Sequence, residues 1–172
     1  MGRIYTVTLQ NQAITTAVDI LEQALTASQV VRIRSAFIGQ SSDAGDANAQ
    51  MLRVVLRRHS GGFTSGSGGS TPTARPHDVT HGAYTGTIEM GNTTLAVNNA
   101  GTMTTLLEET FNVQAGWYYT PTPEELFEFN PSERILISIA DTGEDFADAT
   151  ADSLANGVNI SARVTFEVFG AL

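Results

Sequence analysis

The chain has 172 residues, of which 41% are hydrophobic and 16% charged, and this composition suits one globular domain with a sizeable core. Eighteen acidic residues outnumber nine basic residues, and the net charge of −9 disfavours binding to nucleic acid or to an anionic membrane, which normally relies on clusters of basic residues. All nine basic residues are arginine, so the absence of lysine and cysteine excludes a P-loop lysine, a Schiff base, a thiolate nucleophile and a disulfide framework.

The N-terminal segment predicts a strand. In RIYTVTL, Tyr5, Val7 and Leu9 fall on one side of an extended chain, the period of a half-buried strand. Residues 18–25 fit a short helix and a strand equally well, because Val18, Leu21 and Leu25 also follow a helical stripe. The start MGRIYTVTLQ has no apolar core of the signal-peptide kind, and no apolar run approaches the ~18 residues of a membrane span. We expect a soluble protein that folds in a reducing cytoplasm.

Two strands rich in arginine are predicted next, VVRIRSAFIGQ at residues 30–40 and MLRVVLRRH at residues 51–59. In each of them arginine falls on the face opposite the apolar residues. If these strands pair, their outer face carries a positive stripe formed by Arg32, Arg34, Arg53 and Arg57. The stripe would bind acidic residues of a partner, since arginine makes bidentate contacts, or would pair with acids of its own chain.

A glycine-serine segment, RRHSGGFTSGSGGSTPTARPHD, follows at residues 57–78. A phosphate-binding loop needs a helix after it, and Pro72 and Pro76 oppose one. The alternation from Ile160 to Val168 predicts a long C-terminal strand that needs a neighbour on each edge. We therefore expect one domain over residues 1–172, with residues 60–78 as an internal loop. Residues 61–75, which include Phe63 and Arg75, are a candidate arm that becomes ordered on binding a partner.

Further short strands are predicted between residues 82 and 168, each with turn residues beside it. Together they make about eight to ten strands at regular spacing, which is typical of an all-β antiparallel sandwich or barrel.

Metal chemistry is a weaker interpretation. His77, His81 and Glu89 could supply ligands to a metal-dependent β-barrel enzyme, but the spacing of the two histidines requires a helix, and Pro76 opposes one. The acidic segment at residues 141–153 has only fragments of an EF-hand pattern and predicts a solvated connection. No Gly-x-Ser-x-Gly element is present either. We expect no enzyme activity, no cofactor and no metal.

The densest aromatic segment is GWYYTPTPEELFEFN, at residues 116–130. Trp117, Tyr118 and Tyr119 could stack on a sugar, anchor a protein interface or belong to a core strand. Because alternation buries only about half of a strand, we expect at least one of these rings at an edge or a contact surface.

The order of four motifs resembles small virion proteins encoded by tailed bacteriophages. These motifs are GQSSDAGDANAQMLRVVLRRH, TSGSGGSTPTARP, EETFNVQAGWYYTPTPEE and SERILISI, and the resemblance runs from about Tyr5 to Phe166. It implies a jelly-roll-like head decoration, or cement, protein that clamps neighbouring major capsid subunits on the outer shell. The acidic segment at residues 141–153 departs from the pattern of the group.

The resemblance implies a non-enzymatic structural protein on the capsid exterior, assembled in the host bacterial cytoplasm as a homodimer or homotrimer. Its expected partner is the major capsid protein, with no nucleic acid or membrane partner. The alternative is a carbohydrate- or receptor-binding jelly-roll module of a phage fibre. The candidate partner-binding residues are Arg32, Arg34, Arg53, Arg57, Phe63, Arg75, Trp117, Tyr118 and Tyr119.

Overall fold

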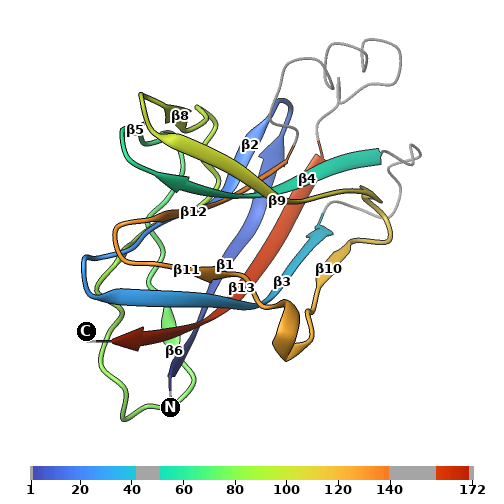
Figure 1. Ribbon diagram of the computed structural model, residues 1–172. Helices are drawn as coiled ribbons and strands as arrows, with labels where there is room; N and C mark the ends of the chain where they lie inside the picture. The colour runs from blue at the N-terminus through green and yellow to red at the C-terminus, as the bar shows by residue number, and fades with distance from the viewer. Residues whose placement is uncertain (1, 42–50, 140–157, 171–172) are drawn as a thin grey trace.

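A computed structural model describes residues 2–41, 51–139 and 158–170 (Figure 1). The acidic segment at residues 141–153 lies outside these ranges. No helix within them is long and apolar enough to cross a membrane. The described elements are β1 (Arg3–Ile14), β2 (Val18–Ala24), β3 (Gln29–Gln40), β4 (Met51–Ser60), β5 (Phe63–Thr64), β6 (Arg75–Pro76), β7 (Thr87–Glu89), β8 (Val97–Asn98), β9 (Thr102–Asn112), β10 (Trp117–Tyr119), the 3-10 turn η1 (Pro123–Glu125), β11 (Glu128–Phe129), β12 (Arg134–Ile139) and β13 (Val158–Gly170).

Two antiparallel sheets pack face to face. Sheet A has the strand order β10-β3-β13-β1-β6, with β11 also paired to β3, and sheet B has the order β7-β2-β12-β4-β9 (Figure 1). If the short strands β5, β6, β7, β8 and β11 are set aside, the sheets reduce to the four-stranded orders β10-β3-β13-β1 and β2-β12-β4-β9. Successive strands then change sheet at every step except from β4 to β9, as in a jelly roll. The prediction of an all-β antiparallel sandwich is confirmed.

The core lies between the sheets and follows the predicted alternation. Tyr5 of β1 pairs with Phe166 of β13, and Val7 pairs with Val164. All four side chains are buried, with exposed fractions of 1% or less. Strand β13 lies between β1 and β3, so its two edges are both hydrogen-bonded, as its apolar alternation predicts.

Residues 18–24, which the pattern left open between helix and strand, form β2. The strand lies between β7 and β12, and most of its residues are buried. Its inner side chains, such as Ile20 and Leu21, enter the core, while Asp19 and Glu22 are buried outside the core cluster. A strand covered on both faces loses simple alternation, which explains the ambiguous pattern.

The two arginine-bearing strands do not pair, so the condition for a shared positive stripe is not met. Strand β3 belongs to sheet A and β4 to sheet B, because the connection between them crosses from one sheet of the jelly roll to the other. Arg53 and Arg57 therefore lie on a different sheet from Arg32 and Arg34, and no common stripe forms. Three of the arginines form ion pairs within their own chain: Arg32 with Glu128 at 2.7 Å, Arg34 with Glu167, and Arg53 with Glu108 at 2.9 Å.

The glycine-serine segment is attached to its own chain and is not a free arm. Strand β5 pairs with β8, and β6 pairs with β1. Between them, the backbones of Ser67 and Thr94 exchange hydrogen bonds of 3.0 Å, as do Ser70 and Met90 at 2.8 and 2.9 Å. The segment thus forms bridges with residues 90–98 instead of waiting for a partner to order it.

Glycine is required where this segment approaches residue 99. A Cβ on Gly62 would lie 1.8 Å from the carbonyl oxygen of Asn99, while a Cβ on Gly82 would have no neighbour within 4 Å. We expect Gly62→Ala to cost about 1–3 kcal/mol, because the backbone must move apart. Urea unfolding measures this cost. Hydrogen exchange should also accelerate at the Asn99 amide, which donates to the Gly62 carbonyl at 3.0 Å.

Gly82→Ala is the matched control, and it should change the unfolding free energy by less than about 0.5 kcal/mol. Equal stability of the two variants would show that the close approach at Gly62 does not constrain the segment.

Candidate functional site

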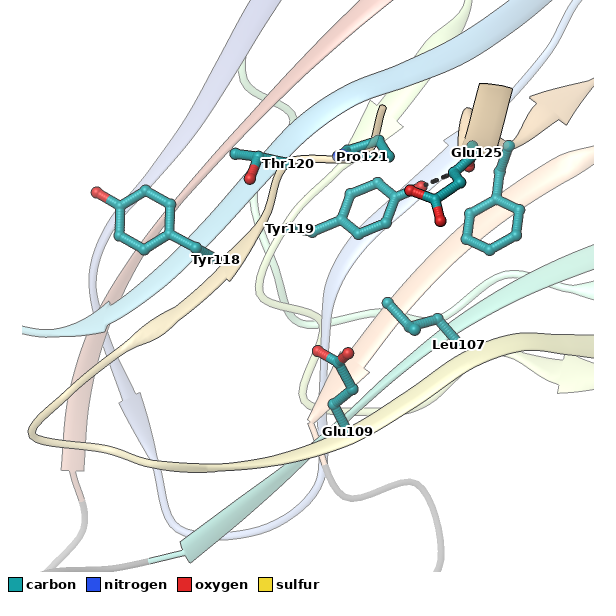
Figure 2. A pocket seen from close by; sticks show the side chains of 8 residues that line it. Leu107, Glu109, Tyr118, Tyr119, Thr120, Pro121 and Glu125 are labelled. Atoms are coloured by element: carbon teal, nitrogen blue, oxygen red, sulfur yellow. Dashed lines mark hydrogen bonds between the residues drawn. The ribbon is translucent and has the colours of Figure 1, made fainter. Parts of the chain in front are cut away.

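A groove of about 570 Å³ lies where the two sheets end side by side (Figure 2). Strand β9 is the last strand of sheet B on this side and β10 the last strand of sheet A, so the groove runs between two sheet edges. Its lining includes Leu107 and Glu109 of β9, Tyr118 and Tyr119 of β10, and Glu125 and Phe127 from the connection that follows.

Near-parallel aromatic rings form one wall of the groove. The Tyr119 and Phe127 rings, which line the groove, lie 5.9 Å apart with an interplanar angle of 6°. The covered Trp117 ring is not part of the lining and lies 6.2 Å from Tyr119 at 12°. Burial raises the pKa of the Tyr119 hydroxyl, which donates a hydrogen bond of 3.4 Å to the Glu125 carbonyl oxygen (Figure 2). The wall offers apolar ring surface that does not ionise near neutral pH.

Two carboxylates border this wall, and in each of them the oxygen Oε2 accepts hydrogen bonds from the chain. Oε2 of Glu109 accepts a hydrogen bond of 2.5 Å from the Trp117 indole, which ties β9 to β10 across the sheet edges. Oε2 of Glu125 accepts hydrogen bonds from the Thr122 hydroxyl at 3.0 Å and from the Thr122 backbone amide at 3.4 Å, and the bond from the amide belongs to the capping box of η1. Within the described residues, no hydrogen bond or ion pair reaches Oε1 of either glutamate.

The three predicted stacking rings do not share one face. Trp117 is only 5% exposed, whereas Tyr118 is 62% exposed and packs against Phe37 at 4.7 Å. Tyr119 follows Trp117 on the inner side, because side chains alternate along a strand. The expectation that one ring of this run lies on the surface is confirmed. A sugar platform that uses Trp117 is not available, because its ring is covered.

The other predicted partner-binding residues lie elsewhere. Phe63 packs against His59 at 4.6 Å and beneath the Arg134 guanidinium at 4.3 Å, and Arg75 lies on β6 beside β1.

Sequence reasoning missed Glu109 and Glu125 as site residues. The Thr-x-x-Glu capping box at residues 122–125 is a local signal that could have located Glu125. Glu109 had no such signal, because its place depends on how the two sheet edges meet.

A second polar site lies under the glycine-serine segment. Asp19 and Glu22 of β2 are 2% and 3% exposed. The Asp19 carboxylate accepts hydrogen bonds of 2.7 Å from the Ser138 hydroxyl and from the Ala96 amide. Glu22 accepts one of 2.9 Å from the Gly66 amide. These two carboxylates fasten loop backbone to sheet B.

Asp19 makes the stability of the fold depend on pH. Burial raises the pKa of its carboxyl, although the hydrogen bonds from Ser138 and Ala96 oppose the shift. A raised folded-state pKa means that the stabilising contribution is complete below the unfolded pKa and is lost as pH rises through the folded pKa. We therefore expect wild type to gain stability relative to D19N as pH falls from about 8 toward 4, measured by urea unfolding at each pH.

The Asp78→Asn variant serves as the contrast. Hydrogen bonds from the backbone amide and hydroxyl of Thr80 lower the pKa of this exposed carboxyl, so its contribution is lost as pH falls through the folded pKa. The stability difference between wild type and this variant should therefore stay level from about pH 8 to 4 and decline only below the unfolded pKa of about 3.9. A D19N difference that is constant across the pH range would contradict the assignment.

His77 and Glu89, two residues of the weaker metal interpretation, lie at different sheets. The His77 ring is hydrogen-bonded to Thr6 of β1, beside sheet A, while Glu89 lies on β7 of sheet B and accepts from Asn92 at 3.1 Å. Among the described residues, no group of three or more His, Cys, Asp or Glu side chains could hold a metal ion.

Comparison with known proteins adds the following result: no family model, curated protein or solved structure matches this chain.

Proposed function

We propose that this chain is a non-enzymatic virion protein that decorates and stabilises the outer surface of a tailed-phage capsid by bridging major capsid subunits. The observation that carries the proposal is the jelly-roll strand order, found in a chain whose QSSD, MLRV, TSGSGG and PTPEE motifs resemble those of phage decoration proteins.

The strand pairing within the sandwich supports a mechanical role. The long pairings of β13 with β1 and β3 supply many cross-strand hydrogen bonds, which resist shear between strands.

The arginines on β3 form ion pairs with Glu128 and Glu167 of their own chain. Contacts with the shell would therefore rely more on exposed side chains such as Tyr118 than on an arginine stripe.

The mechanism is additive burial. Each copy covers a modest area of shell at low desolvation cost, because its surface is rich in uncharged polar residues. A homodimer or homotrimer that touches several capsid subunits at once turns weak single contacts into lasting attachment. Such a protein acts on the capsid exterior after assembly in the host cytoplasm.

Capsids that lack the protein provide the test. The purified protein is mixed with such shells, and the particles are imaged by electron microscopy beside shells incubated with an unrelated jelly-roll protein. We expect density at regular positions on the outer surface of the first sample alone. Bare shells at saturating protein concentration would refute the decoration function.

A further inference from the structure

The groove between β9 and β10 carries negative charge without compensation. Glu109 and Glu125 line it, and none of its lining residues is basic. Neighbouring acids differ in this respect, because Glu108 is paired with Arg53 at 2.9 Å and Glu128 with Arg32 at 2.7 Å. A ligand for the groove is therefore expected to bring a positive charge.

The wall of the groove favours a flat cation. The Tyr119 and Phe127 rings are nearly parallel, and an arginine guanidinium stacks on such faces while donating in-plane hydrogen bonds to carboxylates. Oε1 of Glu109 and Oε1 of Glu125 are the acceptors that the described chain leaves for it. A neutral sugar could use the rings, but it would leave both charges uncompensated.

The edges beside the groove accept extended chain. In the described structure β9 pairs only with β4, and β10 only with β3, so one edge of each strand has no strand partner. An edge of this kind can add a further strand through main-chain hydrogen bonds, with alternate side chains entering pockets. Strand β9 spans 11 residues, long enough to align a short extended peptide.

We propose that this groove binds an extended protein segment whose arginine side chain enters between Glu109 and Glu125 and lies against Tyr119. Identification of that segment as part of the major capsid protein rests on the proposed function. The inference that the groove binds an arginine-bearing segment does not rest on that function.

Labelled peptides test the proposal directly. The probe is a capped, fluorescein-labelled peptide with arginine at alternate positions between threonines, and its match carries citrulline, the uncharged isostere of arginine. Fluorescence anisotropy should show binding of the arginine peptide at least about tenfold tighter than binding of the citrulline peptide. The affinity should fall as salt is added.

Charge-neutral variants locate the site. We expect Glu109→Gln and Glu125→Gln each to weaken the arginine peptide about tenfold. Glu124→Gln changes the net charge equally but lies outside the groove lining, and it should weaken binding by less than about twofold. Equal loss in all three variants would reduce the effect to net charge and overturn the proposal.

Other occupants give different results. Binding of a fluorescein-labelled neutral hexasaccharide, measured by anisotropy in the absence of arginine-peptide binding, would assign the groove to carbohydrate and overturn the proposal. A fluorescence change on raising protein concentration alone, without peptide binding, would assign it to a second copy, with the same consequence.

The two proposals fail separately. If shells bind wild type and Glu109→Gln equally, and the peptides do not bind, the groove inference fails while decoration stands. If the arginine peptide binds as expected but shells remain bare, decoration fails while the groove stands.

Discussion

Replacement of Phe166 by alanine is expected to lower the free energy of unfolding by about 3–5 kcal/mol, the range for removing a buried phenylalanine from a packed core. The side chain is fully buried on β13 and forms a cluster with two other rings that also contact each other. It stacks on Tyr5 at 5.8 Å and meets Tyr84 edge-on at 5.2 Å. Truncation removes both aromatic contacts and leaves a cavity, and urea unfolding measures the loss.

Phe169→Ala is the control on the same strand. This ring is partly exposed, lies outside the core cluster and contacts the Arg32 guanidinium at 4.7 Å. An exposed contact of this type contributes up to about 1 kcal/mol. If both variants lost the same stability, the Tyr5–Phe166–Tyr84 cluster would not be the main aromatic support of sheet A.

Replacement of Arg134 by methionine is expected to cost about 2–3 kcal/mol. Its guanidinium lies 3.0 Å from Glu22, whose side chain is 3% exposed, and it also contacts the Phe63 ring and the Ser65 hydroxyl. Removal of the arginine leaves a buried carboxylate without its ion-pair partner. The cost stays below the ~3–5 kcal/mol of a fully buried pair, since the Arg134 side chain is 30% exposed. Urea unfolding measures it.

Two further variants test whether the unpaired Glu22 charge causes the loss of stability in Arg134→Met. Arg32→Met removes an ion pair whose side chains are 40% and 43% exposed, and should cost about 1 kcal/mol or less. Adding Glu22→Gln to Arg134→Met should recover part of the loss, because the uncompensated charge disappears. Strict additivity of the two substitutions would mean that the pair does not act as a unit.

These substitutions test the core and the attachment of the glycine-serine segment separately. Phe166 reports the core between the sheets, while Arg134 and Glu22 report the attachment of residues 60–71 to sheet B. The Glu22 carboxylate accepts a hydrogen bond from the Gly66 amide. Loss of the Arg134–Glu22 ion pair should therefore release residues 60–71 before the sandwich unfolds. Hydrogen exchange at Gly66 would reveal that order.

Much of the sandwich could be predicted from periodicity. Alternation at Tyr5 and Val7, and again from Ile160 to Val168, predicts strands with one buried face, and the structure pairs them directly. Residues 18–24 could not be assigned in this way. Their outer face is covered by loop residues far along the chain, so Asp19 and Glu22 occupy positions that are buried yet polar.

The candidate site was only partly visible in the sequence. The aromatic run at residues 117–119 indicates rings near an edge, and the capping box marks the turn that carries Glu125. Glu109 becomes part of the groove only because β9 and β10 close the same side of the sandwich.

Local patterning alone thus determined that the chain is built of antiparallel strands and which residues enter its core, because burial on one face imposes a period of two. Only the tertiary structure decided that Arg32 and Arg53 belong to opposite sheets, that the glycine-serine segment is fastened to the buried Glu22 carboxylate, and that two glutamates border one aromatic groove. These features depend on contacts between residues distant in the chain, and such contacts leave no period in the sequence.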